Sequence, residues 1–249
     1  MKRRFTGLTD PGLVRSVNQD CYYIDPEGRF FIVADGMGGH SGGEEASWLA
    51  TDKLQSYLNE HWDEDEDSST LLKAAVIKAN EAILQDQQAH PERSDMGTTI
   101  VVAIFRDEVD RPCCAHVGDS RLYRLRGAKL EQITEDHTWV ARATQIGELT
   151  PDQARIHPWR HVLSQCLGRE GLNHIDTQVL TVQPGDRLLL CSDGLTEELP
   201  DRAIASYLKS IRGCEKAAAA LIDAAKSKGG RDNITTIIVA IDDAHAVEE

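Results

Sequence analysis

The chain has 249 residues, of which 41% are hydrophobic, and a formal net charge of −14 at pH 7. This length suits one large domain or two small ones with a sizeable core, and the negative charge argues against nucleic acid as a partner. Because the apolar runs fall far short of the ~20 residues of a membrane-spanning helix, and the basic start has no apolar region behind it, we expect a soluble, cytoplasmic protein.

Short strands and two long helices are predicted in the first part of the chain. The strands are expected at 4–9, 21–25 and 29–34. Apolar residues then recur at helical spacing in 44–62 and 70–87, and Ser69 or Thr70 is expected to cap the second helix. The charged block at 63–67 is expected to be a solvated linker, because runs of like charge seldom order.

Strands dominate the middle of the chain, and helices return near its end. Further strands are expected at 98–105, 112–117, 120–125, 129–133, 175–181, 187–191 and 233–240. Further helices are expected at 137–145, 150–156, 201–209 and 214–228. Strands and helices in separate blocks predict the α+β class. Two helices on each outer sheet face give a four-layer αββα sandwich of two antiparallel β-sheets flanked by helix pairs.

Five aspartates lie at strand ends or in tight turns, mostly beside a glycine. They are Asp20, Asp35, Asp119, Asp193 and Asp232. Carboxylates at strand ends let a fold gather several oxygens around hard divalent cations, and a neighbouring glycine lets the backbone approach closely. Any one of these turns has an ordinary interpretation, because Asp-Gly is a common turn signal. The set of five favours a metal site. The six cysteines form no Cys-x-x-Cys pair and indicate neither a zinc site nor a disulfide framework.

Seven sequence blocks carry a family resemblance. They are R-S-V-N-Q-D, D-G-M-G-G-H, M-G-T-T, H-V-G-D-S-R, I-T-E-D-H, S-D-G-L and G-G-R-D-N-I-T. In this order they resemble the metal-dependent protein serine/threonine phosphatases, the PPM or protein phosphatase 2C-type family, from about Gly7 to Val239. The resemblance implies one phosphatase domain over 1–241 with the αββα fold, a flap subdomain at about 147–171 and a polar tail at 242–249.

The resemblance also implies which residues bind the metals. Asp35 is expected to bridge two cations, with the Gly36 carbonyl on the second ion. Asp193 and Asp232 are expected to complete the first ion, and Asp20 to lie near the second, directly or through a water. Because every ligand is an oxygen, Mg²⁺ or Mn²⁺ is expected, and zinc is not.

A third, weaker ion and a phosphate-binding arginine are further implications of the resemblance. Asp119 is expected to hold the third ion together with Asp193. Arg15 occupies the position of the family's phosphate-binding arginine, whose planar fork can hold two phosphate oxygens. The alternative for Arg15 is a surface salt bridge. Arg15, Asp35 and Asp193 are thus the expected catalytic residues.

The general acid and the other substrate contacts stay open. Eukaryotic relatives place a histidine where this chain has Met37, so the leaving group would take its proton from a metal-bound water or from His40. Arg160 and His161, in the irregular stretch at 147–171, are candidate substrate contacts beside His40. For both histidines a structural role is the alternative.

The expected activity is hydrolysis of phosphoserine or phosphothreonine on proteins, by direct attack of a hydroxide that bridges two divalent cations. The short form is similar to stand-alone bacterial members, especially the cyanobacterial phosphatase of the PII signalling protein. Phosphorylated PII is therefore a candidate partner, and a monomer is expected.

Two other classes of protein share some of these features. A non-catalytic binding module on this fold is disfavoured, because the metal ligands Asp35, Asp193 and Asp232 are all present. A calcium-binding structural protein is disfavoured too, because the chain lacks a D-x-D-x-D-G loop with a terminal glutamate and because such a protein leaves Arg15 unexplained.

Overall fold

Two antiparallel β-sheets form the centre of the molecule. The structure, a computed structural model, describes residues 1–39, 42–106, 111–172 and 174–243. The first sheet contains, in spatial order, β1 (Lys2–Asp10), β11 (Ile234–Asp242), β10 (Arg187–Cys191), β7 (Arg121–Arg126) and β8 (Lys129–Gln132). The second contains β2 (Asp20–Ile24), β3 (Phe30–Met37), β5 (Ile100–Ile104), β6 (Cys113–Val117) and β9 (Asp176–Val179), with the short β4 (Gly97–Thr98) paired to β3.

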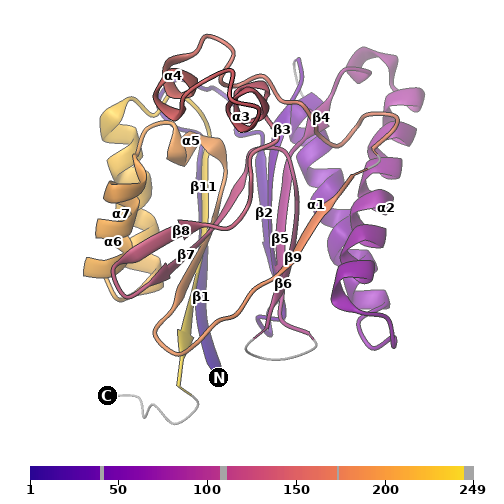
Figure 1. Cartoon of the computed structure of the whole chain (residues 1–249). Helices are drawn as coiled ribbons and strands as arrows, with labels where there is room; N and C mark the ends of the chain where they lie inside the picture. Colours follow the sequence, from indigo (N-terminus) through magenta and orange to yellow (C-terminus); the bar gives the residue numbers. More distant parts are fainter. Residues whose placement is uncertain (40–41, 107–110, 173, 244–249) are drawn as a thin grey trace.

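A pair of long helices covers the outer face of each sheet (Figure 1). On the second sheet lie α1 (Gly42–Glu60) and α2 (Ser68–Ala89), and on the first lie α6 (Asp201–Ser210) and α7 (Cys214–Lys228). The four layers are therefore helix pair, sheet, sheet and helix pair. This arrangement confirms the α+β, four-layer αββα sandwich expected from the sequence.

Three apolar clusters fill the spaces between the four layers. In β3, Phe30 and Ile32 pack beneath α1 and α2, whereas Phe31 and Val33 pack between the two sheets. Successive side chains of a strand point to opposite faces, so a strand covered on both faces must be apolar throughout. The uninterrupted apolar run at 30–34 therefore marks a central strand of the sandwich.

The strand expected at 98–105 is interrupted at Thr99, which lies between β4 and β5. The Thr99 backbone N–H donates to the carbonyl oxygen of Asp35 at 2.9 Å, and Thr98 Oγ1 donates to the same oxygen at 2.8 Å. Asp35 N–H in turn donates to Thr99 Oγ1 at 3.1 Å. The two threonines thus hold the backbone at the end of β3, where a carboxylate enters the candidate site.

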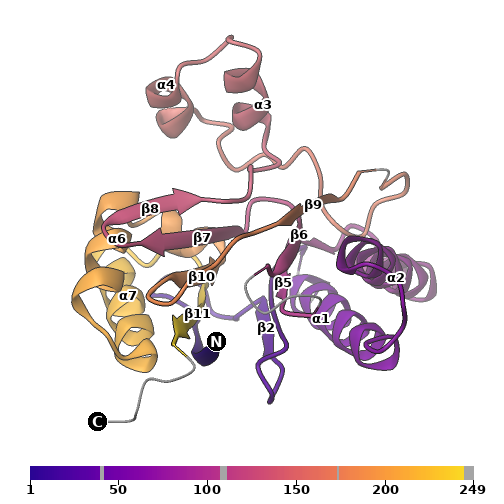
Figure 2. The ribbon, with the colours of Figure 1, turned by 60° about the horizontal axis from the view of Figure 1, so that its bottom comes forward.

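A projecting unit stands away from the sheets (Figure 2). It contains α3 (Trp139–Gln145), α4 (Pro151–Ile156) and the loops around them. Its ends are joined by backbone hydrogen bonds, from Trp139 N–H to Val162 O and from Ser164 N–H to His137 O, both at 2.8 Å. The flap expected at 147–171 overlaps this unit, which begins earlier because α3 belongs to it.

The remaining expectations for the fold concern the membrane and the tail. Within the described ranges, no helix is long and apolar enough to cross a membrane. Asp242 is the last residue of β11, and its carboxylate pairs with Arg4 at 2.6 Å. The rest of the expected polar tail, from 244 to 249, lies outside the described residues.

Candidate active site

The five aspartates come from different elements but lie in one place. Asp20 begins β2, Asp35 lies near the end of β3, Asp119 follows β6, Asp193 follows β10 and Asp232 precedes β11. Burial raises the pKa of Asp35 well above its usual range, and the charges of the four other aspartates raise it further. The fold therefore gathers the five aspartates predicted from the sequence into one acidic cluster, in which Asp119 is buried, three others are partly buried and Asp232 has a side chain that is 30% exposed.

Asp20 links the two sheets, because it lies in β2 of the second sheet and bonds to residues at the ends of strands in the first. Its Oδ2 accepts hydrogen bonds from Ser192 Oγ at 2.7 Å and from Thr235 Oγ1 at 2.6 Å. Burial nevertheless raises the pKa of Asp20 to about 6. Its other oxygen, Oδ1, is buried and accepts no hydrogen bond from the described residues, and the same holds for Asp193 Oδ1.

Two glycines allow the backbone to pass close to the acidic cluster. A Cβ on Gly36 would lie 1.9 Å from the carbonyl oxygen of Gly43, and a Cβ on Gly194 would lie 2.0 Å from that of Asn233. Real Cβ atoms never approach backbone this closely, so neither position can carry a side chain without moving its neighbour. The glycines that follow Asp35 and Asp193 are thus required by packing around the carboxylates.

Asp193 begins α5 (Asp193–Thr196), a single helical turn that sequence reasoning interpreted only as a tight turn. The helical turn brings Glu197 to the same face as Asp193. Burial raises the pKa of Asp193, and the charge of Glu197 is the next largest cause. Glu197 is therefore a member of the acidic site that sequence analysis missed. Its spacing of four residues from Asp193 would have revealed it if a helix had been expected there.

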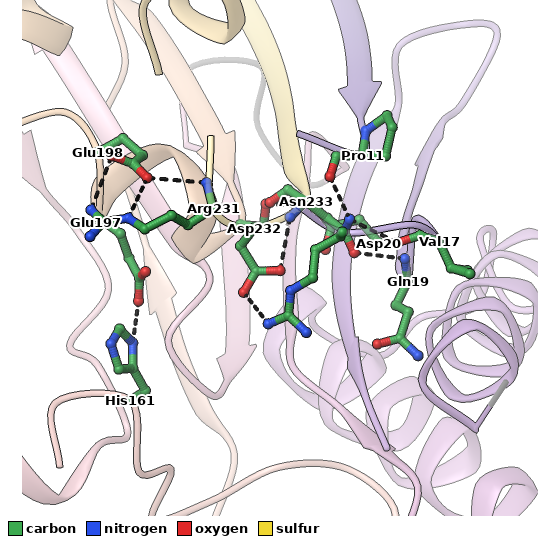
Figure 3. Close-up of polar contacts among 12 residues, drawn as sticks. Pro11, Val17, Gln19, Asp20, His161, Glu197, Glu198, Arg231, Asp232 and Asn233 are labelled. Carbon is green, nitrogen blue, oxygen red and sulfur yellow. Dashed lines mark hydrogen bonds and ion pairs between the residues drawn. The ribbon is translucent and has the colours of Figure 1, made fainter. Parts of the chain in front are cut away.

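The projecting unit reaches the acidic site through His161. Its Nδ1 contacts Glu197 Oε1, and the two side chains point toward one another (Figure 3). Potential ligand atoms of His161, Glu197 and Asp193 all lie within 4.8 Å of one another. Arg160 is exposed, and its positive charge lowers the pKa of His161 after the larger effect of burial. His161 thus faces the centre, whereas Arg160 lies beside it on the surface.

Asp119 lies in the turn between β6 and β7 and is 8% exposed. Burial raises its pKa well above the usual range, and the charges of Asp193 and Asp136 raise it further. Asp193 is thus the member of the acidic cluster whose charge raises the pKa of Asp119 most. This is consistent with the expected pairing of Asp119 and Asp193.

Arg15 contacts the site through Asp232. Arg15 Nη2 donates to Asp232 Oδ2 at 2.8 Å, and the Arg15 side chain is 52% exposed. The loop that carries Arg15 is held by Asn233, whose side chain donates to the carbonyls of Pro11 and Val17 and accepts from the Gln19 N–H (Figure 3). Arg15 is therefore a half-exposed cation at the rim of a buried acidic centre.

His40, the remaining candidate from the sequence, lies outside the described residues. The donor set that is described fits hard divalent cations. It consists of carboxylate oxygens, two of them buried without a hydrogen bond from the described residues, in a cluster where burial, and after it mutual repulsion, raises the pKa of Asp20, Asp35 and Asp193. A like-charged cluster of this kind is stabilised when cations neutralise it.

Three comparisons with known proteins agree with this geometry. A sequence profile described as Protein phosphatase 2C matches residues 14–227. The serine/threonine phosphatase stp of Listeria monocytogenes serotype 4b is 37% identical over 243 residues, which cover 94% of this chain and 94% of that protein. The crystal structure of the Mycobacterium tuberculosis serine/threonine phosphatase PstP/Ppp matches with a TM-score of 0.87 and 36% identity over 97% of this chain and 99% of that chain.

A further crystal structure shows the catalytic domain of PstP in complex with two manganese ions. It matches with a TM-score of 0.84 and 36% identity, over 97% of this chain and 99% of that chain. The fold, the buried acidic centre and these matches show that the chain belongs to the protein phosphatase 2C family. It is a metal-dependent protein serine/threonine phosphatase, and hence a hydrolase.

Proposed function

We propose that the acidic centre of this phosphatase holds two divalent cations, Mn²⁺ or Mg²⁺, and uses them to hydrolyse phosphoserine and phosphothreonine on proteins. The observation that supports this most is the gathering of five aspartates, with two buried carboxylate oxygens that accept no hydrogen bond from described residues. When bound, such cations supply an activated water and offset the charge that develops on the transferred phosphoryl group.

The proposed ligands follow from the placement of the carboxylates. Asp35 would be shared between the two ions, because its pKa is raised by burial and then by the charges of all four other aspartates. The Gly36 carbonyl would be a neighbouring ligand. Asp193 and Asp232 would complete one ion, and Asp20 would support the other. The chain's own work is to hold these oxygens in a rigid, buried arrangement before substrate arrives.

Asp119 is proposed to hold a third, weaker ion together with Asp193. Its burial and raised pKa make a carboxylate that favours a cation as neighbour. The structure adds Glu197 and His161 beside Asp193 as groups that can influence this side of the centre. The leaving group is proposed to take its proton from a water held by the cations or from His40.

The direct test is hydrolysis of phosphoserine and phosphothreonine peptides in Mn²⁺, comparing the wild type with Asp193→Asn. Glu198→Gln is a suitable control, because Glu198 pairs with Arg231 rather than with the aspartates. The wild type and the control should release phosphate, and Asp193→Asn should not. Comparable turnover by Asp193→Asn would exclude the proposed role of that carboxylate.

Arg15 is proposed to bind the substrate phosphate, because its guanidinium already reaches a carboxylate of the centre. Arg15→Ala should lower kcat/KM about 10- to 100-fold, mainly through KM, since charge-assisted hydrogen bonds contribute roughly 1.5–3 kcal/mol. Arg15→Lys should recover only part of this, because an ammonium lacks the planar fork. Calorimetry should show that both variants still bind Mn²⁺, and loss of metal in Arg15→Ala would contradict the assignment.

We propose that residues 1–241 form a single domain with a flap at about 147–171. The flap is proposed to contribute to the recognition of protein substrates. Exposed Trp159 and Arg160 present an aromatic ring and a cation directly before His161 in the chain, and His161 contacts Glu197 of the centre. Arg160→Ala should lower the rate on a phosphoprotein about tenfold and leave p-nitrophenyl phosphate hydrolysis within about twofold. Arg202→Ala, on an exposed part of α6, serves as the matched control. An equal loss on both substrates would exclude a role in specificity.

Phosphorylated PII is proposed as a candidate substrate, on the resemblance of the short form to the cyanobacterial PII phosphatase. Incubation with phosphorylated PII and with an unrelated phosphoserine protein compares the two rates directly. A strong preference for phosphorylated PII is expected, and equal rates would argue against PII as the substrate.

We further propose that the protein is a cytoplasmic monomer. Light scattering should return a mass near 27.5 kDa, and a stable dimer would contradict this.

A further inference from the structure

A second cluster of titratable side chains lies outside the aspartate centre. His116 in β6, His137 and Asp176 in β9 place potential ligand atoms within 4.8 Å of one another. These residues line a cavity of about 660 Å³ that also includes Arg142 and His174. Two histidines and a carboxylate are a common transition-metal site. Their hydrogen bonds, however, indicate a different role.

The tautomer of His137 is fixed by a backbone donor. The Gly118 N–H donates to His137 Nδ1 at 3.1 Å, so this nitrogen must carry a lone pair rather than a proton. The proton of the ring therefore lies on Nε2, which donates to Asp176 Oδ2 at 2.7 Å. A metal on Nε2 would have to displace this proton while Nδ1 stays an acceptor. The bonding pattern thus favours an orienting role over metal binding.

Both the backbone N–H and the backbone carbonyl of Gly118 form hydrogen bonds with His137. In addition to the contact with Nδ1, the Gly118 carbonyl accepts from the His137 backbone N–H at 2.9 Å. Gly118 has a φ of +107°, and a Cβ there would lie 2.6 Å from Thr99 Cγ2. The turn therefore depends on glycine at this position and is fixed from one side by a single histidine. The next residue is Asp119.

His137 is itself held on two sides. Its ring stacks on the ring of His116 with centroids 4.5 Å apart. Burial lowers the pKa of His116, which favours a neutral ring, and its Nε2 donates to the Glu135 carbonyl at 2.8 Å. Asp176 holds Nε2 of His137 and is also bonded by His174 at 2.9 Å. The orientation of the His137 ring is thus held by contacts within the protein.

We propose that His137 is a positioning residue whose hydrogen bonds to Gly118 fix the Gly118–Asp119 turn and so present the Asp119 carboxylate to the third cation. This inference rests on the proposed role of Asp119 as the ligand of that cation. Among the described residues, the side-chain hydrogen bonds of His137 go to Gly118 and Asp176 and not to the five aspartates of the centre, so its effect on the centre should pass through the Gly118–Asp119 turn.

Two substitutions separate the contacts of His137. In His137→Asn, the side-chain oxygen occupies the place of Nδ1 and can still accept from Gly118 N–H, while the bond to Asp176 is lost. In His137→Gln, the longer amide can still donate to Asp176, but the acceptor for Gly118 moves away. The inference expects the asparagine variant to resemble the wild type and the glutamine variant to be impaired.

The first measurement is amide hydrogen exchange in the metal-free protein, which does not depend on activity. Exchange at Gly118 should be about tenfold faster in His137→Gln and nearly unchanged in His137→Asn, because one hydrogen bond contributes roughly 1 kcal/mol. The Mn²⁺ concentration for half-maximal turnover should rise about tenfold in His137→Gln only, with KM for a phosphopeptide unchanged at saturating Mn²⁺. Equal behaviour of the two variants would overturn the inference.

A double-mutant cycle with Asp119→Ala tests whether the effect passes through Asp119. If it does, His137→Gln should cause no further loss of turnover in the Asp119→Ala background. Independent, additive losses would overturn the positioning role while leaving the metal function of Asp119 intact. Wild-type turnover by Asp119→Ala would instead remove the third ion, and the positioning role with it. The two-ion phosphatase function would be untouched.

Discussion

Replacing Asp35 with asparagine is expected to abolish hydrolysis and, at the same time, to stabilise the metal-free protein. Burial raises the pKa of Asp35 well above its usual range. The charges of Asp20, Asp193, Asp119 and Asp232 raise it further. An amide of the same shape removes one of these repelling charges. We expect the melting temperature in EDTA to rise by several degrees, whereas activity in Mn²⁺ should fall at least about 10³-fold.

Asp25→Asn provides the matched control, because Asp25 is also a buried aspartate at the end of a β-strand region. It is 1% exposed and pairs with Arg29 at 2.6 Å, and although burial opposes this, the hydrogen bonds and charge of Arg29 lower its pKa. Here the substitution should lower the melting temperature and leave the turnover of the folded protein unchanged. Destabilisation by Asp35→Asn in EDTA would show that Asp35 is a structural residue rather than one held ready for cations.

Mn²⁺ is expected to stabilise the protein more strongly as the pH rises. Burial raises the pKa of Asp20 from 3.8 to about 6 and raises those of Asp35 and Asp193 as well. In metal-free protein the folded state therefore binds more protons than the unfolded state, and its stability falls as pH rises through about 6. Cations replace these protons, so the difference in melting temperature between Mn²⁺ and EDTA should widen.

This difference can be followed by thermal unfolding from pH 5.5 to 7.5. At a Mn²⁺ concentration of 100 times Kd, binding contributes about 2.7 kcal/mol, which corresponds to roughly 5–10 °C for a chain of this size. Near pH 5.5 the difference should be much smaller. The comparison within each pH cancels other titrating groups. A difference that is constant with pH, or that shrinks as pH rises, would show that protons and Mn²⁺ do not compete for the same carboxylates.

The architecture could be predicted from the sequence because its signals are local. The long apolar runs identify strands covered on both faces, and blocks of helices identify the outer layers. The five aspartates could be identified for a related reason, because each lies in a motif that marks a strand end. Their convergence follows from the fold, since the two sheets place these strand ends along the same edge of the sandwich (Figure 1).

The errors arise where tertiary contacts override a local pattern. The pattern predicts that Thr99 is a strand residue, yet it lies between β4 and β5, and its side-chain Oγ1 rather than its backbone carbonyl accepts from the Asp35 N–H of β3. The cap of α2 was expected at Ser69 or Thr70, but Asp67 accepts from both of their N–H groups. Glu197 was missed because the single helical turn that aligns it with the centre is too short to give a periodic signal.

The contacts of His161 and His137 were not predictable from spacing. Each histidine meets a carboxylate far along the chain, at Glu197 and Asp176. Such pairs depend on how the projecting unit and β9 pack against the sheets. The sequence therefore identifies the groups that can perform the chemistry, and the structure identifies the groups that hold them in place.

Calorimetric titration of Mn²⁺ into chelator-treated protein tests the central claim most directly. The wild type should bind two ions tightly, and at pH 6 binding should release protons, because carboxylates with raised pKa must ionise to bind a cation. Asp35→Asn should lose both the tight binding and the proton release. Two tightly bound ions in Asp35→Asn, at wild-type affinity, would contradict the assignment of the metal centre to the aspartate cluster.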